Sequence, residues 1–235
     1  MSNSNFNSYP ITGIKVGGTS PRREINAFAN GYPVQFSLFI RALRVFQGMD
    51  FRDLLSYFQV AAIHGLPAVS WDSDPTPRLV TETYPGNYAQ NDVTPDFYCP
   101  HQSLIFPTWH RAYMLLFEQR LWEIMNTQVV PQIPLIYREQ WQLAANTWRM
   151  PYWDWAANPE VPSVVKQENI SIVEPGGSLG APGPNPLYKF STATISTFAK
   201  QPAPAPLLGD QKSFGPWAIF ADHPVRIQCL CRLVD

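Results

Sequence analysis

The chain has 235 residues, of which 45% are hydrophobic and only 15% charged, and its formal net charge is −1. A chain of this length and composition can bury one substantial core, so a single domain over residues 1–235 is expected and disorder throughout is excluded. Lysine and arginine occur singly apart from Arg22 and Arg23. We therefore expect neither a nucleic-acid partner nor an anionic membrane surface as a partner.

The ends of the chain and its cysteines bear on the compartment. The first residues have neither a basic nor an apolar signal region, and no run reaches the roughly 18 apolar residues of a membrane span. The cysteines, Cys99, Cys229 and Cys231, are odd in number, and the last two are too close for a natural bridge. These features predict a chain without a disulfide framework, located in the cytoplasm.

Two helices are predicted before residue 65. The first runs from about Pro33 to Phe46 and ends at Gly48, because apolar residues recur at three-and-four spacing: Phe36, Phe39, Ile40, Leu43 and Phe46. The second begins after Asp50 as N-cap and ends at Ile63 or His64, where Gly65 follows. His64 is thus expected in a last helical turn.

Two more helices are predicted before the proline-rich part of the chain. One runs from about Thr108 to Met125, with His110 in its first turn and an inward stripe of Trp109, Ala112, Tyr113, Leu116, Leu121 and Ile124. A weaker one covers Arg138 to Thr147. Residues 158–224 then contain eleven prolines, which exclude long helices and central strands. The part from 157 to 235 is therefore predicted to be loop-rich.

The four histidines are His64, His101, His110 and His223. The first three fall at a helix end, in a loop and at a helix start, from which side chains can converge. Neutral imidazole suits copper, zinc, iron and nickel, so spacing alone does not choose the metal. His223 stands apart and is followed by Pro224, which disfavours a helix there.

The residues around these histidines form longer motifs. The sequence from Tyr98 to Tyr113 contains Phe-Pro-Thr-Trp-His-Arg, and Phe117-Glu118-Gln119 follows it. This stretch resembles the copper A signature of tyrosinases, polyphenol oxidases and hemocyanin-related proteins. Further stretches resemble other parts of the same family at residues 57–65, 150–156 and, more weakly, 185–188. Residues 9–13 and 21–25 resemble the entry segment of its fungal subgroup.

The resemblance implies a mainly α fold, a tyrosinase-like helical bundle with long Pro-rich loops, whose copper A region covers about residues 50–130. Copper would be bound by His64, His101 and His110. In fungal members a cysteine two residues before the second ligand is joined to that histidine by a thioether, and Cys99-Pro100-His101 has this spacing. The alternative is an unmodified Cys99.

Other residues of these motifs have supporting roles in this reading. Phe106 and Trp109 are expected to pack around the metal and exclude water, or to be ordinary core aromatics. Asp154 is expected to be a structural carboxylate that holds buried donors rather than a catalytic base. No protein side chain is assigned as a catalytic acid, base or nucleophile, because no phosphate loop, Cys-x-x-Cys pair or serine elbow occurs.

A complete tyrosinase has two copper ions and a second trio of histidines, and only one set of ligands is visible here. The chain is therefore expected to be truncated before the copper B half, and His223 is not expected to be a ligand. The resemblance implies a copper oxidoreductase that o-hydroxylates monophenols and oxidises o-diphenols to o-quinones with dioxygen, as in melanin formation. The alternatives are a catechol or o-aminophenol oxidase without the hydroxylase step and a non-enzymatic mononuclear copper-binding fragment. The oligomeric state is left open.

Overall fold

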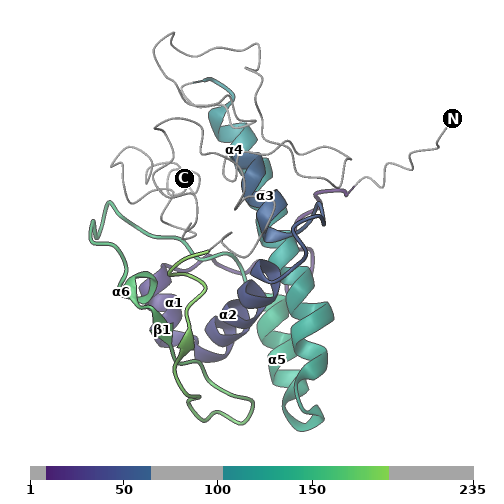
Figure 1. Cartoon of the computed structure of the whole chain (residues 1–235), viewed down its shortest axis with the longest axis vertical. Coiled ribbons are helices and arrows are strands. Elements are labelled where there is room, and N and C mark those ends of the chain that lie inside the picture. The colour runs from purple at the N-terminus through teal and green to yellow at the C-terminus, as the bar shows by residue number, and fades with distance from the viewer. Residues whose placement is uncertain (1–8, 65–102, 191–235) are drawn as a thin grey trace, which may run out of the picture. The chain divides into compact units, whose positions relative to one another are not determined.

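The computed structural model describes residues 9–64 and 103–190 (Figure 1). The chain falls into two compact units, one formed by residues 1–15 and 49–120 and the other by residues 16–48 and 121–235. The described part is built mainly from helices, which confirms the predicted mainly α class. The expectation of a single domain stays a prediction.

In the first unit, helix α3 (Tyr57–His64) begins six residues later than predicted. The carboxylate of Asp50 accepts a hydrogen bond from the amide of Arg52 at 2.9 Å, and that of Asp53 accepts one from Leu55 at 2.8 Å. Short polar side chains that bond their own backbone two residues on favour turns over helix. The predicted N-cap role of Asp50 is therefore wrong, whereas the predicted helix end at His64 is confirmed.

Helix α4 (Phe106–Ile124) begins two residues before the predicted start, so His110 lies in its second turn rather than its first. Pro107 is tolerated at the second position because an amide hydrogen there would have no partner within the helix. Leu116, Leu121 and Ile124 are buried as predicted, but Ala112 is exposed. The prediction that Ala112 belongs to the inward stripe is wrong.

Gln119 fastens the N-terminal segment of the first unit to α4. Its side chain, only 6% exposed, accepts hydrogen bonds from the amides of Thr12 and Gly13 at 2.8 and 3.0 Å. It donates to the hydroxyl of Tyr9 at 2.9 Å and to the carbonyl of Pro10 at 3.1 Å. One amide side chain thus satisfies backbone groups of a segment that has no regular structure of its own.

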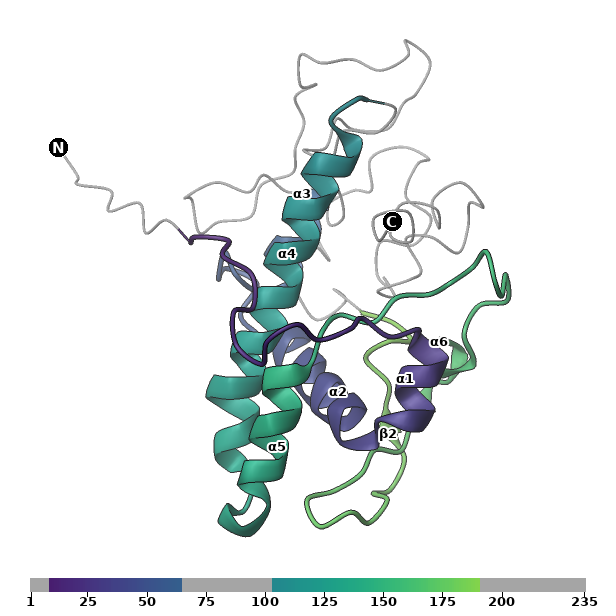
Figure 2. The ribbon, with the colours of Figure 1, turned by 180° about the vertical axis from the view of Figure 1, so that it is seen from behind.

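The second unit is centred on α2 (Pro33–Gln47), which packs on α1 (Ile25–Gly31) and α5 (Leu135–Thr147) (Figures 1 and 2). It also contacts the π-helical turn η1 (Met125–Val129), which leads into the 3₁₀ turn η2 (Val130–Gln132). The predicted apolar face of α2 is buried throughout, which confirms that prediction. Helix α5 begins three residues before its predicted start.

Helix α1 was not predicted from the sequence. Its N-cap is Glu24, whose carboxylate accepts hydrogen bonds from the amides of Asn26 and Ala27 at 2.8 and 2.9 Å. Glutamate is not among the preferred N-cap residues, so the usual start signal is missing. Phe28 then joins α1 to α2 by an edge contact with Phe36, with ring centroids 5.7 Å apart.

Residues 158–190 are mostly loop, as predicted for this part. They contain a single turn of helix, α6 (Ser163–Lys166), and two short antiparallel strands, β1 (Asn169–Ile170) and β2 (Gly183–Pro184). Asn185 is 4% exposed and donates to the carbonyls of Val164 and Gln167 at 2.7 and 2.8 Å. This buried amide replaces the regular hydrogen bonding that the prolines prevent.

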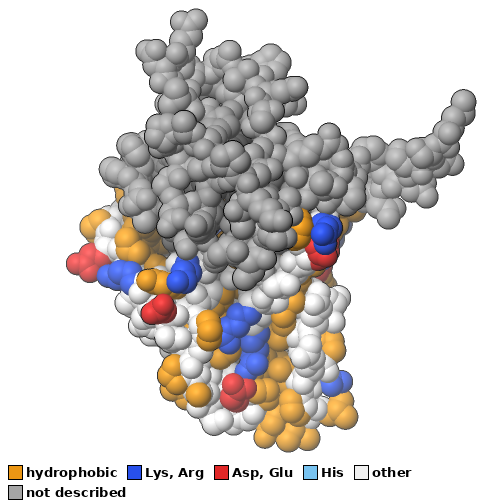
Figure 3. Space-filling view, viewed as in Figure 1, with side chains coloured by type: hydrophobic (Ala, Val, Ile, Leu, Met, Phe, Trp, Pro, Cys, Tyr) orange, Lys and Arg blue, Asp and Glu red, His pale blue; other side chains and the backbone are white. Residues whose placement is uncertain are grey.

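The surface of the described part carries mixed charge. On the face in Figure 3, basic and acidic side chains lie in small groups close to one another, without a continuous field of one sign. Among the helices of residues 9–64 and 103–190, none combines the length and the apolar character that a bilayer crossing requires.

Candidate metal centre

The candidate site lies where α3 and the first half of α4 pack together in the first unit. The ring centroids of Tyr57 and Phe117 are 5.9 Å apart, and those of His64 and His110 are 5.4 Å apart. In each helix the two contacting residues are seven positions apart. The later residue of α3 faces the earlier residue of α4, and the reverse holds for the other pair. Residues seven apart share a helix face, so α3 and α4 pack antiparallel with both histidines at the same end.

His110 has a fixed ring orientation. It is 1% exposed, and its Nδ1 lies 2.8 Å from the carbonyl oxygen of Phe106, one turn earlier in α4. Because a carbonyl oxygen only accepts, Nδ1 carries the proton and Nε2 carries the ring's lone pair. A backbone carbonyl bound to the distal ring nitrogen is the usual arrangement for a metal-ligating histidine.

The separation of the two rings fits one shared metal ion. An imidazole nitrogen about 2 Å from a metal places its ring centroid about 3 Å from that metal, so two rings at a tetrahedral angle have centroids roughly 5 Å apart. The separation of 5.4 Å between His64 and His110, with ring planes at 74°, matches this requirement. The donor chemistry and spacing of this pair therefore suit a transition metal such as copper.

Aromatic rings surround the histidine pair. The ring of Phe106 lies 4.0 Å from that of His110, and the ring of Trp109 lies 4.9 Å from it. Both predicted shielding residues therefore contact a candidate ligand directly. Tyr113 was predicted only as an inward-facing residue, yet its ring lies 5.4 Å from that of His64. The spacing of residues 106, 110 and 113, one and two turns along α4, is the sequence signal that could have identified it.

The other residues that the sequence suggested for the site are not among those that the structure describes. Cys99, His101 and His223 lie outside the described residues, so their ligand and cross-link roles stay predictions. Within residues 9–64 and 103–190, no three histidine, cysteine or acidic side chains gather in a way that could hold a metal. What the structure brings together is the pair His64 and His110.

Asp154 has a more modest role than predicted. It is half-buried, and its carboxylate accepts a hydrogen bond from the exposed amide of Ala157 at 3.0 Å. The donor of this bond is exposed, so the expectation that Asp154 holds buried donors is wrong for it. The carboxylate closes a turn after the Tyr-Trp-Asp-Trp motif.

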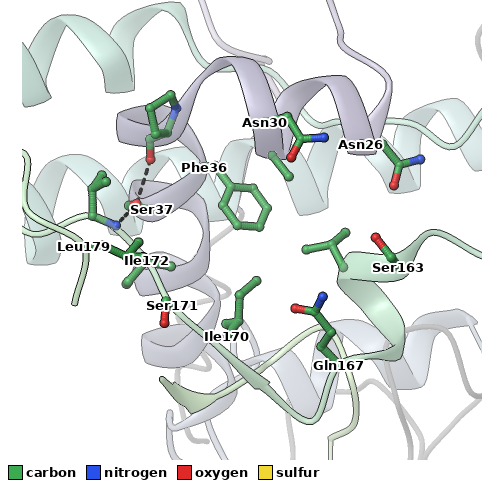
Figure 4. A pocket seen from close by; sticks show the side chains of 14 residues that line it. Asn26, Asn30, Phe36, Ser37, Ser163, Gln167, Ile170, Ser171, Ile172 and Leu179 are labelled. Carbon is green, nitrogen blue, oxygen red and sulfur yellow. Dashed lines mark hydrogen bonds between the residues drawn. The ribbon is translucent and has the colours of Figure 1, made fainter. Parts of the chain in front are cut away.

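A groove in the second unit is one of the concave features of the described surface. It lies between α1, the start of α2, α6 and β1, and its volume is about 230 Å³ (Figure 4). Its polar lining side chains are amides and hydroxyls, such as Asn26, Asn30 and Gln167, and none of its lining residues is ionisable. The groove therefore offers no side chain for metal binding by imidazole or for acid-base chemistry.

Comparison with known proteins identifies the family. Residues 54–217 match the family model described as the common central domain of tyrosinase. The chain belongs to the tyrosinase family. The tyrosinase of Aspergillus fumigatus is 36% identical over 228 residues, which cover 89% of this chain and 34% of that protein. Polyphenol oxidase 3 of Agaricus bisporus is 35% identical over 66% of this chain and 26% of its own length.

Solved structures agree with this membership. The holo-protyrosinase of Aspergillus oryzae superposes with a TM-score of 0.67 at 32% identity, covering 88% of this chain and 36% of that one. The sequence and structure comparisons thus agree on membership of the tyrosinase family. The chain spans about a third of the length of the relatives it matches.

Proposed function

We propose that this chain binds one copper ion through His64, His101 and His110. The observation that supports the proposal is the pair of rings from α3 and α4, 5.4 Å apart, with the proton of His110 held on Nδ1 by the carbonyl of Phe106. His101 would be the third ligand, by its match to the family motif. Copper supplies one-electron redox chemistry and binds imidazole strongly.

The protein residues orient the ligands and exclude water. The Phe106 carbonyl keeps Nε2 of His110 as the coordinating atom, and the rings of Phe106 and Trp109 cover the side of His110 that they contact. Water exclusion strengthens the interaction between a metal and its ligands because it lowers the local dielectric constant. A thioether between Cys99 and His101 would restrain the third ligand in the same way, and peptide mapping that finds Cys99 alkylated in copper-loaded protein would contradict it.

The proposed activity is that of a tyrosinase-type oxidase in the cytoplasm, in which phenolic substrates are oxidised with dioxygen. Its two steps would be o-hydroxylation of monophenols and oxidation of o-diphenols to o-quinones. In the family this chemistry requires two copper ions, and the four histidines of this sequence cannot provide two trios of ligands. We therefore assign to this chain the first copper site, and the oxidase activity to a protein that also has the second.

The same histidine count favours a second candidate, a copper-binding protein without oxidase activity. Metal analysis of the purified full chain separates the two. Oxygen consumption on catechol by the copper-loaded chain would support the oxidase. One copper ion and no oxygen consumption would support the binding protein, and a monophenol in place of catechol tests the hydroxylase step.

His64→Ala and His110→Ala test the site itself, because each removes one proposed ligand. Both are expected to lose copper at a concentration that saturates the unsubstituted chain. Gln140→Ala is the matched control, since Gln140 is an exposed residue of α5, and it should retain copper. Full copper binding by both histidine variants would refute the proposed site.

A further inference from the structure

Tyr113 is placed where it can set the orientation of a candidate copper ligand without touching the metal. Its ring lies 5.4 Å from the ring of His64 at an interplanar angle of 32°. The ring of Trp109, one turn earlier in α4, lies 5.5 Å from that of Tyr113 at 18°. Tyr113 and Trp109 are stacked, whereas the ring of His64 is tilted against that of Tyr113, and both separations are those of aromatic contacts. The three rings form a compact cluster, because the centroids of His64 and Trp109 are also only 6.3 Å apart.

The two histidines are held by different means. His110 is oriented by its own helix, through the bond from Nδ1 to the Phe106 carbonyl. His64 is the last residue of α3, and its packing partners on α4 are Trp109, His110 and Tyr113. Among these, Tyr113 is the one whose ring plane lies closest to parallel with the imidazole. Rotation of the His64 ring about χ2 would therefore disturb its ring contact with Tyr113.

We propose that Tyr113, supported by Trp109, is a positioning residue that fixes the ring of His64 in the orientation required for copper binding. The inference rests on the proposed role of His64 as a ligand. The aromatic ring of Tyr113 performs this task, because the contact with His64 is made between the two rings. Groups that orient metal ligands typically change metal affinity by 10- to 100-fold when they are removed.

The test uses the full chain and three substitutions on α4. Tyr113→Phe keeps the ring and is expected to keep copper(I) affinity within about threefold, measured by competition with a chromophoric chelator. Tyr113→Leu removes the ring and is expected to lower the affinity about 10- to 100-fold. Leu116→Ala destabilises the same helix at a buried position outside the cluster of the His64, Trp109 and Tyr113 rings. It is expected to retain the copper(I) affinity.

A second measurement needs no metal. The chain has only four histidines, so the imidazole C–H signals in a ¹H–¹³C spectrum can be assigned with a His64→Gln variant. The ring current of Tyr113, whose ring contacts that of His64, should displace the His64 signals. Tyr113→Leu is expected to move them, whereas Tyr113→Phe should leave them in place.

Each outcome has one reading. Loss of affinity in Tyr113→Leu, together with rescue in Tyr113→Phe and the expected shift of the His64 signals, supports the positioning role. Equal losses in Tyr113→Phe and Tyr113→Leu, equal losses in Tyr113→Leu and Leu116→Ala, or unmoved His64 signals in Tyr113→Leu would overturn it. Unchanged copper binding in His64→Ala would instead overturn the proposed ligand role, so the two failures are distinguishable.

Discussion

Replacing Gln119 with alanine should release the N-terminal segment from α4. The substitution removes two bonds that the amides of Thr12 and Gly13 donate, and two that Gln119 donates to Tyr9 and Pro10. At about 1 kcal/mol of net stabilisation per bond, the upper limit is about 4 kcal/mol. Residues 10–12 are exposed, so water can replace part of the lost bonding. We expect a loss of about 2 kcal/mol, or roughly 30-fold in the equilibrium between the bound and released segment.

Native-state hydrogen exchange measures this equilibrium where it occurs. The amides of Thr12 and Gly13 should lose their protection in Gln119→Ala. In Gln119→Glu the protection should persist in part, because a carboxylate still accepts from both amides but no longer donates to Tyr9 and Pro10. Gln140→Ala is again the exposed control. Protection of Thr12 and Gly13 that is the same in Gln119→Ala and Gln140→Ala would refute this role of Gln119.

Two further predictions concern the second unit and are read from chemical denaturation. Gly17→Ala should destabilise this unit by about 3 kcal/mol or more, since a Cβ there would lie 2.1 Å from the carbonyl oxygen of Asn146. Gly18 also has a positive φ but no atom within 4 Å of such a Cβ, so Gly18→Ala should cost only about 1 kcal/mol. Equal losses in the two variants would contradict the close approach at Gly17. Ser37→Ala should cost about 2 kcal/mol, because the buried hydroxyl of Ser37 accepts a hydrogen bond from the amide of Val173 at 2.9 Å and the substitution leaves that amide without its acceptor. Ser37→Thr keeps the hydroxyl group and is the control. A loss below about 0.5 kcal/mol in Ser37→Ala would contradict this role of the Ser37 hydroxyl.

Helices with a clear apolar period were predicted closely. Helix boundaries were predicted less accurately where polar side chains bond to nearby backbone amides and compete with the helical hydrogen bonds. The buried face of α2 follows from its spacing, and its bounds differ from the prediction by one residue. At α3, Asp50 and Asp53 bond to nearby amides and form turns, which a pattern of apolar residues does not register. Helix α1 was missed because its cap is a glutamate.

The sequence predicted both histidines that the structure brings together, His64 and His110, but not their geometry. The motif around His110 identified the family, and the family model then matched residues 54–217. The antiparallel register of α3 and α4 comes from packing between segments distant in the chain, such as Tyr57 against Phe117. The helical spacing places Tyr113 on the same face as His110, but its contact with His64 follows from that register and could not be predicted from α4 alone.

X-ray absorption at the copper edge tests the central claim most directly. The copper(I)-loaded full chain should give a first shell of nitrogen scatterers with the multiple-scattering pattern of imidazole, at about 2 Å. We expect that pattern to weaken in His64→Ala and in His110→Ala and to be unchanged in His223→Ala. A shell that depends on His223, or one that is unaffected by loss of both His64 and His110, would contradict the account.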